Sequence, residues 1–127
     1  MTAANFMQKA ERALSSAQTL LDIGDAEGAC NRAYYAMFDA AHAALLGFGA
    51  ELPETSPKTH RGLIAAFGRH LVLGKHVAAE FGASLNKVER LRTLADYTGD
   101  PIGANDAAWA VGQAEMFVAA MKASLAR

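Results

Sequence analysis

The sequence predicts an all-α protein, folded as an up-and-down bundle of four long helices plus a shorter fifth. Apolar residues recur every three or four positions in several segments, which is the spacing of one face of an α-helix. β-branched residues are scarce, and no segment alternates apolar and polar residues over the length of a strand. Glycine and proline fall between the periodic segments, where helices end. Short connections of this kind favour antiparallel packing of neighbouring helices.

The first two predicted helices have the most regular patterns. A first helix ends near residues 24–25, and its apolar face steps by four and three through Phe6, Ala10, Ala13, Ala17 and Leu20. A second helix runs from about Asp25 to Leu46. It stops at Gly47-Phe48-Gly49, because glycine accepts the backbone conformation that follows a helix.

The second half of the chain predicts three more helices. Residues 48–58, with two prolines, form a loop, and a weaker helix over residues 59–73 is loosened by three glycines. A helix over residues 77–97 turns Leu85, Val88, Leu91 and Ala95 inward and is broken by Thr98-Gly99-Asp100-Pro101. Asn105 or Asp106 is expected to cap the last helix. That helix keeps a heptad spacing through Ala107, Val111, Ala114, Val118, Met121 and Leu125.

Composition restricts the class of protein. Residues 1–127 are expected to form a single domain with a packed core, since 52% of the residues are hydrophobic and only three are proline. No apolar run is long enough to span a bilayer, the amino terminus does not resemble a secretory signal, and the single cysteine, Cys30, fits a cytoplasmic setting. The formal charge of −1 argues against a strongly basic nucleic-acid clamp. Any contact with RNA would need a local basic patch or the assembly of two chains.

The second helix carries a stripe of polar side chains. Arg32, Tyr35, Asp39 and His42 fall within one sector of about 80° around the helix axis. The opposite side holds Tyr34, Met37, Phe38, Ala41 and Leu45. Two interpretations are open, because buried polar groups need partners and exposed ones in a row form a binding site. In the structural interpretation, Arg32 bridges to Asp96 or Asp39 and fixes the helix register, with Tyr35 completing the hydrogen bonds.

Four segments resemble small prokaryotic HEPN-domain proteins. They are Arg32-Ala-Tyr-Tyr-Ala-Met-Phe38, Lys58-Thr-His-Arg-Gly62, Arg92-Thr-Leu-Ala-Asp96-Tyr97 and Ala114-Glu-Met-Phe-Val118, in this order, and the similarity extends from about residue 5 to residue 125. The resemblance implies a four- or five-helix bundle that often dimerises. Many members are metal-independent RNases, frequently toxins encoded beside a minimal nucleotidyltransferase antitoxin. Other members have lost catalysis and act as binding or scaffolding modules.

Active members of this family carry an arginine, then four to six residues, then a histidine, often with a tyrosine two residues further on. The planar guanidinium can pair with the scissile phosphate, and the histidine can move the proton of the 2′-hydroxyl attack or of the leaving oxygen. This chain departs from the pattern twice. Asp96 and Tyr97 follow Arg92, and Asp39 stands where a histidine would follow Arg32, with His42 three residues beyond. An aspartate can accept a proton, but it is a poor acid at neutral pH.

The resemblance assigns roles to residues at the end of the fourth predicted helix. Arg92 would bind phosphate, Asp96 would act as a base or orienting group, and Tyr97 would donate a hydroxyl or accept a transferred AMP. Arg32 would be a second phosphate ligand. A homodimer could bring two such sites together through the heptad face of the last helix or through the polar stripe.

Plainer explanations exist for the same residues. Arg92 and Asp96 are spaced i, i+4, as in an ordinary surface ion pair, and Tyr97 could close its helix with its ring in the core. The middle of the chain is basic and forms either a solvated face or a phosphate-binding rim, comprising His60, Arg61, Arg69, His70, Lys75 and His76. His76 and Glu80 have the spacing of a metal pair but lack a third ligand, so neither a metal nor a cofactor is expected.

Three hypotheses follow. The first is a toxin-like RNase that works on RNA or nucleotides, with Arg92, Asp96 and Tyr97 as catalytic residues and Arg32, Tyr35, Asp39 and His42 as binding residues. The second is a non-catalytic module that binds a nucleotide or a partner protein. The third is a bundle whose polar groups only set the register of the helices.

Overall fold

A computed structural model of the chain describes residues 2–50 and 59–126, and it confirms the all-α bundle. In the described ranges the elements are helical throughout: α1 (Ala3–Asp22), α2 (Ala26–Gly47), α3 (His60–Ala66), the π-helical segment η1 (Phe67–Val72), α4 (Ala79–Thr98) and α5 (Ala104–Leu125). The predicted loop lies largely outside the described residues, as does Lys58 of the second family-like segment.

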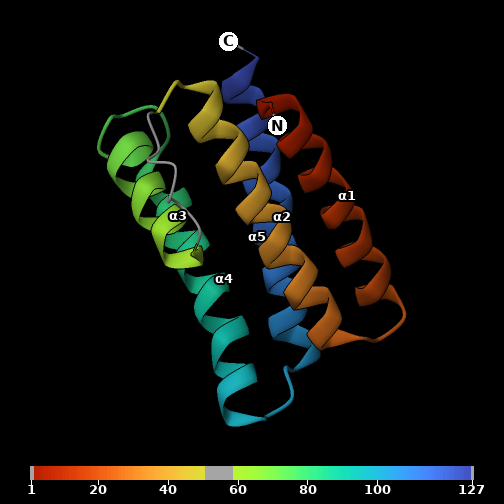
Figure 1. Cartoon of the computed structure of the whole chain (residues 1–127). Helices are drawn as coiled ribbons and strands as arrows, with labels where there is room; N and C mark the ends of the chain where they lie inside the picture. Colours follow the sequence, from red (N-terminus) through yellow and green to blue (C-terminus); the bar gives the residue numbers. More distant parts are fainter. Residues whose placement is uncertain (1, 51–58, 127) are drawn as a thin grey trace.

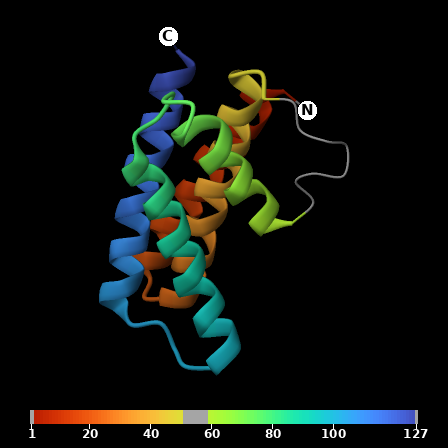
Figure 2. The same cartoon turned by 90° about the vertical axis from the view of Figure 1, so that its left-hand side faces the viewer.

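The four long helices alternate in direction along the chain. Figure 1 shows α2 in front of α5, with α1 on one side and α3 and α4 on the other. Turned by 90°, Figure 2 shows that α3 and η1 run in the same direction as α2 and pack beside the first half of α4. The up-and-down order therefore holds for α1, α2, α4 and α5, with α3 and η1 added along one side.

Helix α2 is the centre of the bundle and contacts every other helical element. Every alanine from Ala29 to Ala44 is fully buried, as are Tyr34, Met37 and Leu45 on the face that the sequence predicts to be apolar. Small side chains allow neighbouring helices to approach closely, so α2 can be enclosed on most of its circumference. Its larger polar side chains are consequently held at the seams between α2 and its neighbours.

The helix ends explain most of the predicted boundaries. Thr2, Asp25 and Thr59 each accept a hydrogen bond from a backbone N–H in the first turn of α1, α2 and α3. Gly99 ends α4 in the left-handed conformation, with φ 73°.

The prediction that Asn105 or Asp106 caps the last helix was wrong. Helix α5 begins at Ala104 after the N-cap Gly103, which makes no side-chain cap hydrogen bond. Asp106 lies inside the first turn, where its charge still interacts favourably with the helix dipole.

The weaker helix predicted over residues 59–73 is two segments, because α3 continues directly into the π-helical η1. The chain then turns before α4, which begins at Ala79, two residues later than predicted. Lys75 adopts φ 61° in this turn, and a Cβ on Gly74 would overlap the carbonyl oxygen of His70. Glycine at position 74 is therefore required by this close approach of the backbone.

The heptad face of α5 packs against the other helices of the same chain. Its members Ala107, Val111, Ala114, Val118 and Met121 are all buried against the rest of the bundle. The suggestion that this face supplies a dimer contact was therefore wrong, because the surface is already covered. No helix in the described part of the chain is both long and apolar enough to cross a membrane.

Candidate functional site

Helix α4 places Arg92 against the two tyrosines of α2. The guanidinium carbon of Arg92 lies 4.7 Å from the ring centre of Tyr34 and 5.9 Å from that of Tyr35. Only 18% of the Arg92 side chain is exposed, and its Nε is buried without a hydrogen-bond partner among the described residues. A cation held on an aromatic face is favourable and restricts the rotamers of the arginine. Arg92 is therefore positioned before any ligand binds.

The other contact of Arg92 is weak. Its Nη1 lies 3.5 Å from Oδ2 of Asp96, one turn further along α4, and the Asp96 side chain is 70% exposed. Such a long, solvated i, i+4 pair contributes at most a few tenths of a kcal/mol. A stronger anion could therefore replace the carboxylate at little cost.

Arg92 and Arg32 line the same cavity. The space between α2 and α4 has a volume of about 370 Å³, and Asp96 is also part of its wall. We call it the α2–α4 cavity. Asp25 and Glu27, at the start of α2, line it too, so the wall carries two guanidinium groups and three carboxylates. Arginines far apart in the sequence thus share one opening, where both could reach a single phosphate group.

Arg32 is exposed, with its guanidinium carbon 5.6 Å from the ring centre of Tyr35. Within the described ranges it forms no ion pair, to Asp96, to Asp39 or to any other carboxylate. The predicted bridge across the bundle was therefore wrong. The bridge does not form because Arg32 lies at the solvent-exposed edge of α2, where its guanidinium remains available for a ligand.

His60 is the residue that sequence reasoning did not assign to this site. Its Nδ1 lies 2.7 Å from the hydroxyl oxygen of the fully buried Tyr34, and its ring centre is 4.8 Å from that of Phe38. Burial lowers the pKa of His60, and the charge of Arg92 lowers it further, partly offset by Glu89. The available signal was Tyr34 itself, because a tyrosine hydroxyl in the core requires a hydrogen-bond partner.

The remaining members of the polar stripe are separated by the fold. The ring of His42 stacks on Phe6 of α1 at 3.9 Å between centres, and burial lowers its pKa. Asp39 is only 8% exposed and lines a different cavity, between α1 and α2.

Tyr97, at the end of α4, is 87% exposed, so the suggestion that its ring enters the core was wrong.

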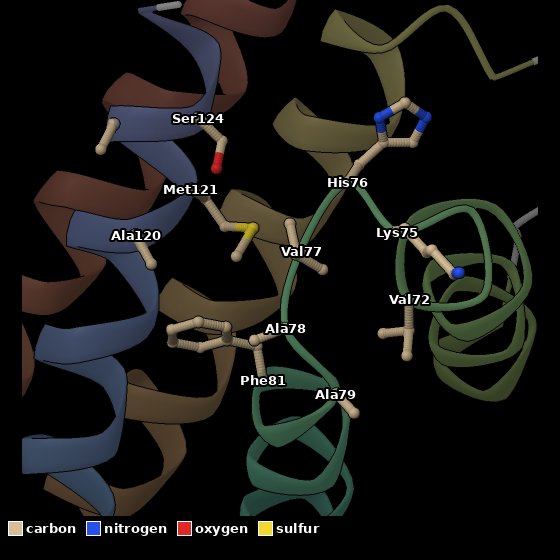
Figure 3. A pocket seen from close by; sticks show the side chains of 11 residues that line it. Val72, Lys75, His76, Val77, Ala78, Ala79, Phe81, Ala120, Met121 and Ser124 are labelled. Atoms are coloured by element: carbon tan, nitrogen blue, oxygen red, sulfur yellow. The ribbon is translucent and has the colours of Figure 1, made fainter.

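A larger cavity shares no described lining residue with the α2–α4 cavity. It has a volume of about 530 Å³, between the start of α4 and the end of α5. Figure 3 shows Val77, Phe81 and Met121 around this space, while the side chains of Lys75 and His76 extend away from α5. The ring of His76 instead lies 4.6 Å from that of Phe48. No arginine among the described residues lines this cavity, so it lacks the planar donors that the α2–α4 cavity offers to a phosphate.

No group of three His, Cys, Asp or Glu side chains in residues 2–50 and 59–126 is arranged to hold a metal ion. The wall of the α2–α4 cavity carries guanidinium and carboxylate groups, and Arg92 also contacts the ring of Tyr34, whose hydroxyl is hydrogen-bonded to the imidazole of His60. These groups can bind an anionic oxygen and transfer protons.

Comparison with known proteins identifies the family of this chain. The sequence profile of the HEPN domain matches residues 3–124, nearly the whole chain. The chain belongs to the HEPN-domain family. Among the relatives of this HEPN domain is a UPF0332 protein of Gloeobacter violaceus, 38% identical over 95 residues, which cover 75% of this chain and 71% of the relative.

A second relative carries a functional name. The protein named "Putative toxin MJ0605" of Methanocaldococcus jannaschii is 36% identical over 116 residues, covering 91% of this HEPN chain and 83% of that protein. A UPF0332 protein of Thermotoga maritima is 33% identical over 90 residues, covering 71% and 64% of the two chains. The family match over residues 3–124 includes both the α2 tyrosines and the end of α4.

Proposed function

We propose that this HEPN protein acts on RNA as the toxin-like member of a toxin–antitoxin pair, and that it binds a phosphodiester in the α2–α4 cavity. Membership of the HEPN family and a relative named as a toxin support the biological role. The convergence of Arg32 and Arg92 on one cavity is the observation that carries the chemical role. Two guanidinium groups offer the planar donors that phosphate oxygens accept.

The proposed reaction is metal-independent cleavage of RNA. The ribose 2′-hydroxyl attacks the adjacent phosphorus, the bond to the 5′-oxygen breaks, and that oxygen leaves with a proton. Arg92 and Arg32 stabilise the negative charge on the phosphate oxygens. Asp96 accepts the hydroxyl proton or orients Arg92. The hydroxyl of Tyr97, at the exposed end of α4, donates the proton that the 5′-oxygen takes as it leaves, and regains one from water.

His60 is the proposed replacement for the histidine that the motif lacks. It shares Tyr34 with Arg92, and a histidine with a lowered pKa is largely neutral at pH 7 and ready to accept a proton. The hydrogen bond to Tyr34 engages Nδ1, which leaves Nε2 for the reacting group.

The decisive experiment measures cleavage of single-stranded RNA by the purified protein and by Arg92→Lys. Lysine keeps the charge but loses the planar fork, so the cleavage rate should fall on the order of tenfold to a hundredfold. Arg90→Lys is the matched control, because Arg90 is an exposed arginine of α4 that lines no cavity described above. Equal rates for the wild type and Arg92→Lys would contradict the assignment of this cavity.

A second candidate function is binding without catalysis. The three carboxylates in the cavity wall and the absence of the motif histidine favour it. Calorimetric titration with AMP separates the two functions. Saturable binding of AMP that needs Arg92, in a protein that leaves RNA intact, would identify a nucleotide-binding module.

The toxin-like role implies partners. A minimal nucleotidyltransferase is the proposed antitoxin, RNA in the cytoplasm is the proposed target, and a homodimer would join two α2–α4 cavities. With the α5 face buried and Asp39 and His42 of the polar stripe packed against α1, only Arg32 and Tyr35 of that stripe remain for the proposed dimer contact. Sedimentation equilibrium of the purified chain measures its oligomeric state directly.

A further inference from the structure

Beside the α2–α4 cavity lies a basic groove between α1 and α2, of which the proposed function uses only Arg32. Its inner part has a volume of about 190 Å³ and is lined by Lys9, Arg12, Ser16, Arg32 and Asp39, together with Ala13. We call these five polar residues the α1–α2 groove. An outer part of about 530 Å³ shares Arg12, Ser16 and Arg32 and adds the hydroxyls of Ser15 and Thr19.

The groove is positively charged, with three cations and one carboxylate. Lys9 and Arg12 are exposed on α1, and Arg32 faces them from α2. None of the three forms an ion pair with a described residue. The single carboxylate of Asp39 offsets only part of their charge, so the groove keeps an excess of positive charge that attracts an anion such as phosphate.

Asp39 provides a second, independent observation. It is more than nine-tenths buried, yet it makes no hydrogen bond or ion pair with any residue in the described part of the chain. Burial raises the pKa of its carboxyl group, while Lys9 and Arg32 act in the opposite direction. Because Asp39 lines the groove and accepts no hydrogen bond from a described residue, its carboxylate can accept one from an O–H or N–H of a ligand.

The groove and the α2–α4 cavity meet at Arg32. Arg32 and Leu20 line both the cavity and the outer part of the groove. A strand that places one phosphate between Arg92 and Arg32 can therefore continue past Arg32 toward α1. Consecutive nucleotides along a strand present phosphates at regular intervals, each with a ribose between.

We propose that the α1–α2 groove binds a ribose-phosphate unit, with its phosphate on Lys9, Arg12 and Arg32 and its 2′-hydroxyl donating a hydrogen bond to Asp39. This inference rests on the proposed function, in which the unit is the nucleotide next to the one whose phosphate binds in the α2–α4 cavity. The 2′-hydroxyl distinguishes RNA from DNA, so Asp39 sets the preference for RNA.

Binding of a short fluorescent single-stranded RNA, and of DNA with the same sequence, tests this proposal by anisotropy. Wild-type protein should bind RNA more tightly. Asp39→Ala should weaken RNA binding about tenfold and leave DNA binding unchanged or slightly tighter, while Asp39→Asn should fall between, because its amide oxygen still accepts a hydrogen bond. Thermal unfolding of both variants checks the fold, which loss of an unpaired buried carboxylate should not weaken.

Arg12→Ala tests the phosphate contact. It should weaken RNA and DNA binding equally and reduce the slope of log Kd against log salt by about 0.7. Arg90→Ala, the loss of another exposed arginine, should change neither. If AMP binds in a way that depends on Asp39 and the RNA strand does not bind, the ligand of the groove is a free nucleotide. If the strand binds and AMP does not, the ligand is RNA.

Outcomes that overturn the groove differ from those that overturn the proposed function. The groove proposal is wrong if the wild-type protein binds RNA and DNA with equal affinity. It is also wrong if Asp39→Ala and Arg12→Ala both bind RNA as tightly as the wild type. If Arg92→Lys still impairs cleavage in that case, the proposed function stands alone. If RNA and AMP both fail to bind the wild-type protein, both proposals are wrong.

Discussion

The Nδ1 of His60 lies 2.7 Å from the hydroxyl oxygen of Tyr34, and this hydrogen bond joins α3 to the centre of α2. Tyr34 is wholly buried, whereas His60 is half-buried. The same tyrosine ring supports the guanidinium of Arg92. The pair therefore links the packing of the short helix to the position of the proposed phosphate-binding arginine.

Because the two partners differ in burial, their removal should have unequal costs. His60→Ala leaves the buried Tyr34 hydroxyl without a partner and should lower the free energy of unfolding by about 1–3 kcal/mol. Tyr34→Phe leaves only a half-buried imidazole that can reach water, so its cost should be smaller, about 1 kcal/mol. Urea denaturation of both variants and of the double variant measures the coupling. A larger loss for Tyr34→Phe than for His60→Ala would contradict this account.

Stability should depend on pH through His60 and His42. Burial lowers the pKa of both below the ordinary 6.5, so in mildly acidic solution the unfolded chain binds more protons than the folded one. Their contribution is therefore complete above about pH 6.5 and is lost as pH falls below it. Denaturation at a series of pH values should show this decline, and a His42→Gln, His60→Gln double variant should flatten it. Asp39 has a raised pKa and acts with the opposite sign at lower pH, in wild type and variant alike.

Asp96→Asn separates two roles of the carboxylate beside Arg92. The substitution removes the 3.5 Å ion pair and one negative charge from the cavity wall. RNA binding should tighten by about threefold, since a solvated pair of this kind contributes less than 1 kcal/mol. If Asp96 is the base, cleavage should fall despite the tighter binding. Tighter binding with unchanged cleavage would leave His60 as the base.

Tyr97 should be the acceptor of AMP if a nucleotidyltransferase antitoxin regulates this protein. Its side chain is exposed, so its hydroxyl can attack the α-phosphorus of ATP in the partner enzyme, with release of pyrophosphate. Mass spectrometry after incubation with ATP and a minimal nucleotidyltransferase should show one added adenylyl group. Tyr97→Phe should abolish the addition and Tyr35→Phe should retain it. Modification of both variants alike would exclude Tyr97.

The small residues of α2 should tolerate no enlargement. Ala40 is fully buried in the core, so Ala40→Leu should destabilise the fold by about 1–3 kcal/mol or more through overpacking. Ala83→Leu, on the exposed side of α4, is the matched control and should change stability by less than about 0.5 kcal/mol. Chemical denaturation of the two variants gives the comparison. Equal stability would mean that α2 is not closely packed.

The sequence predicted the bundle well because helix periodicity and capping are local. The inward positions of α1, such as Ala10 and Ala17, and the buried face of α2 follow from spacing alone. The start of α5 was misplaced, because a glycine at the N-cap gives no side-chain signal. The division of residues 59–73 into α3 and η1 was also missed, since a change of helix type has no simple sequence pattern.

The amino-acid sequence by itself determined the helices, the apolar core and the family-like segments. Only the tertiary structure decided which polar groups meet. The stripe on α2 meets different neighbours: Arg32 lines both the α2–α4 cavity and the α1–α2 groove, Asp39 lines the groove, and Tyr35 lies beside the guanidinium of Arg92. The physical reason is that residue spacing along one helix determines which side chains share a face, whereas the neighbouring helices determine which groups each side chain contacts. His60 forms its hydrogen bond with Tyr34 for the same reason, since no local sequence pattern connects the start of α3 to α2.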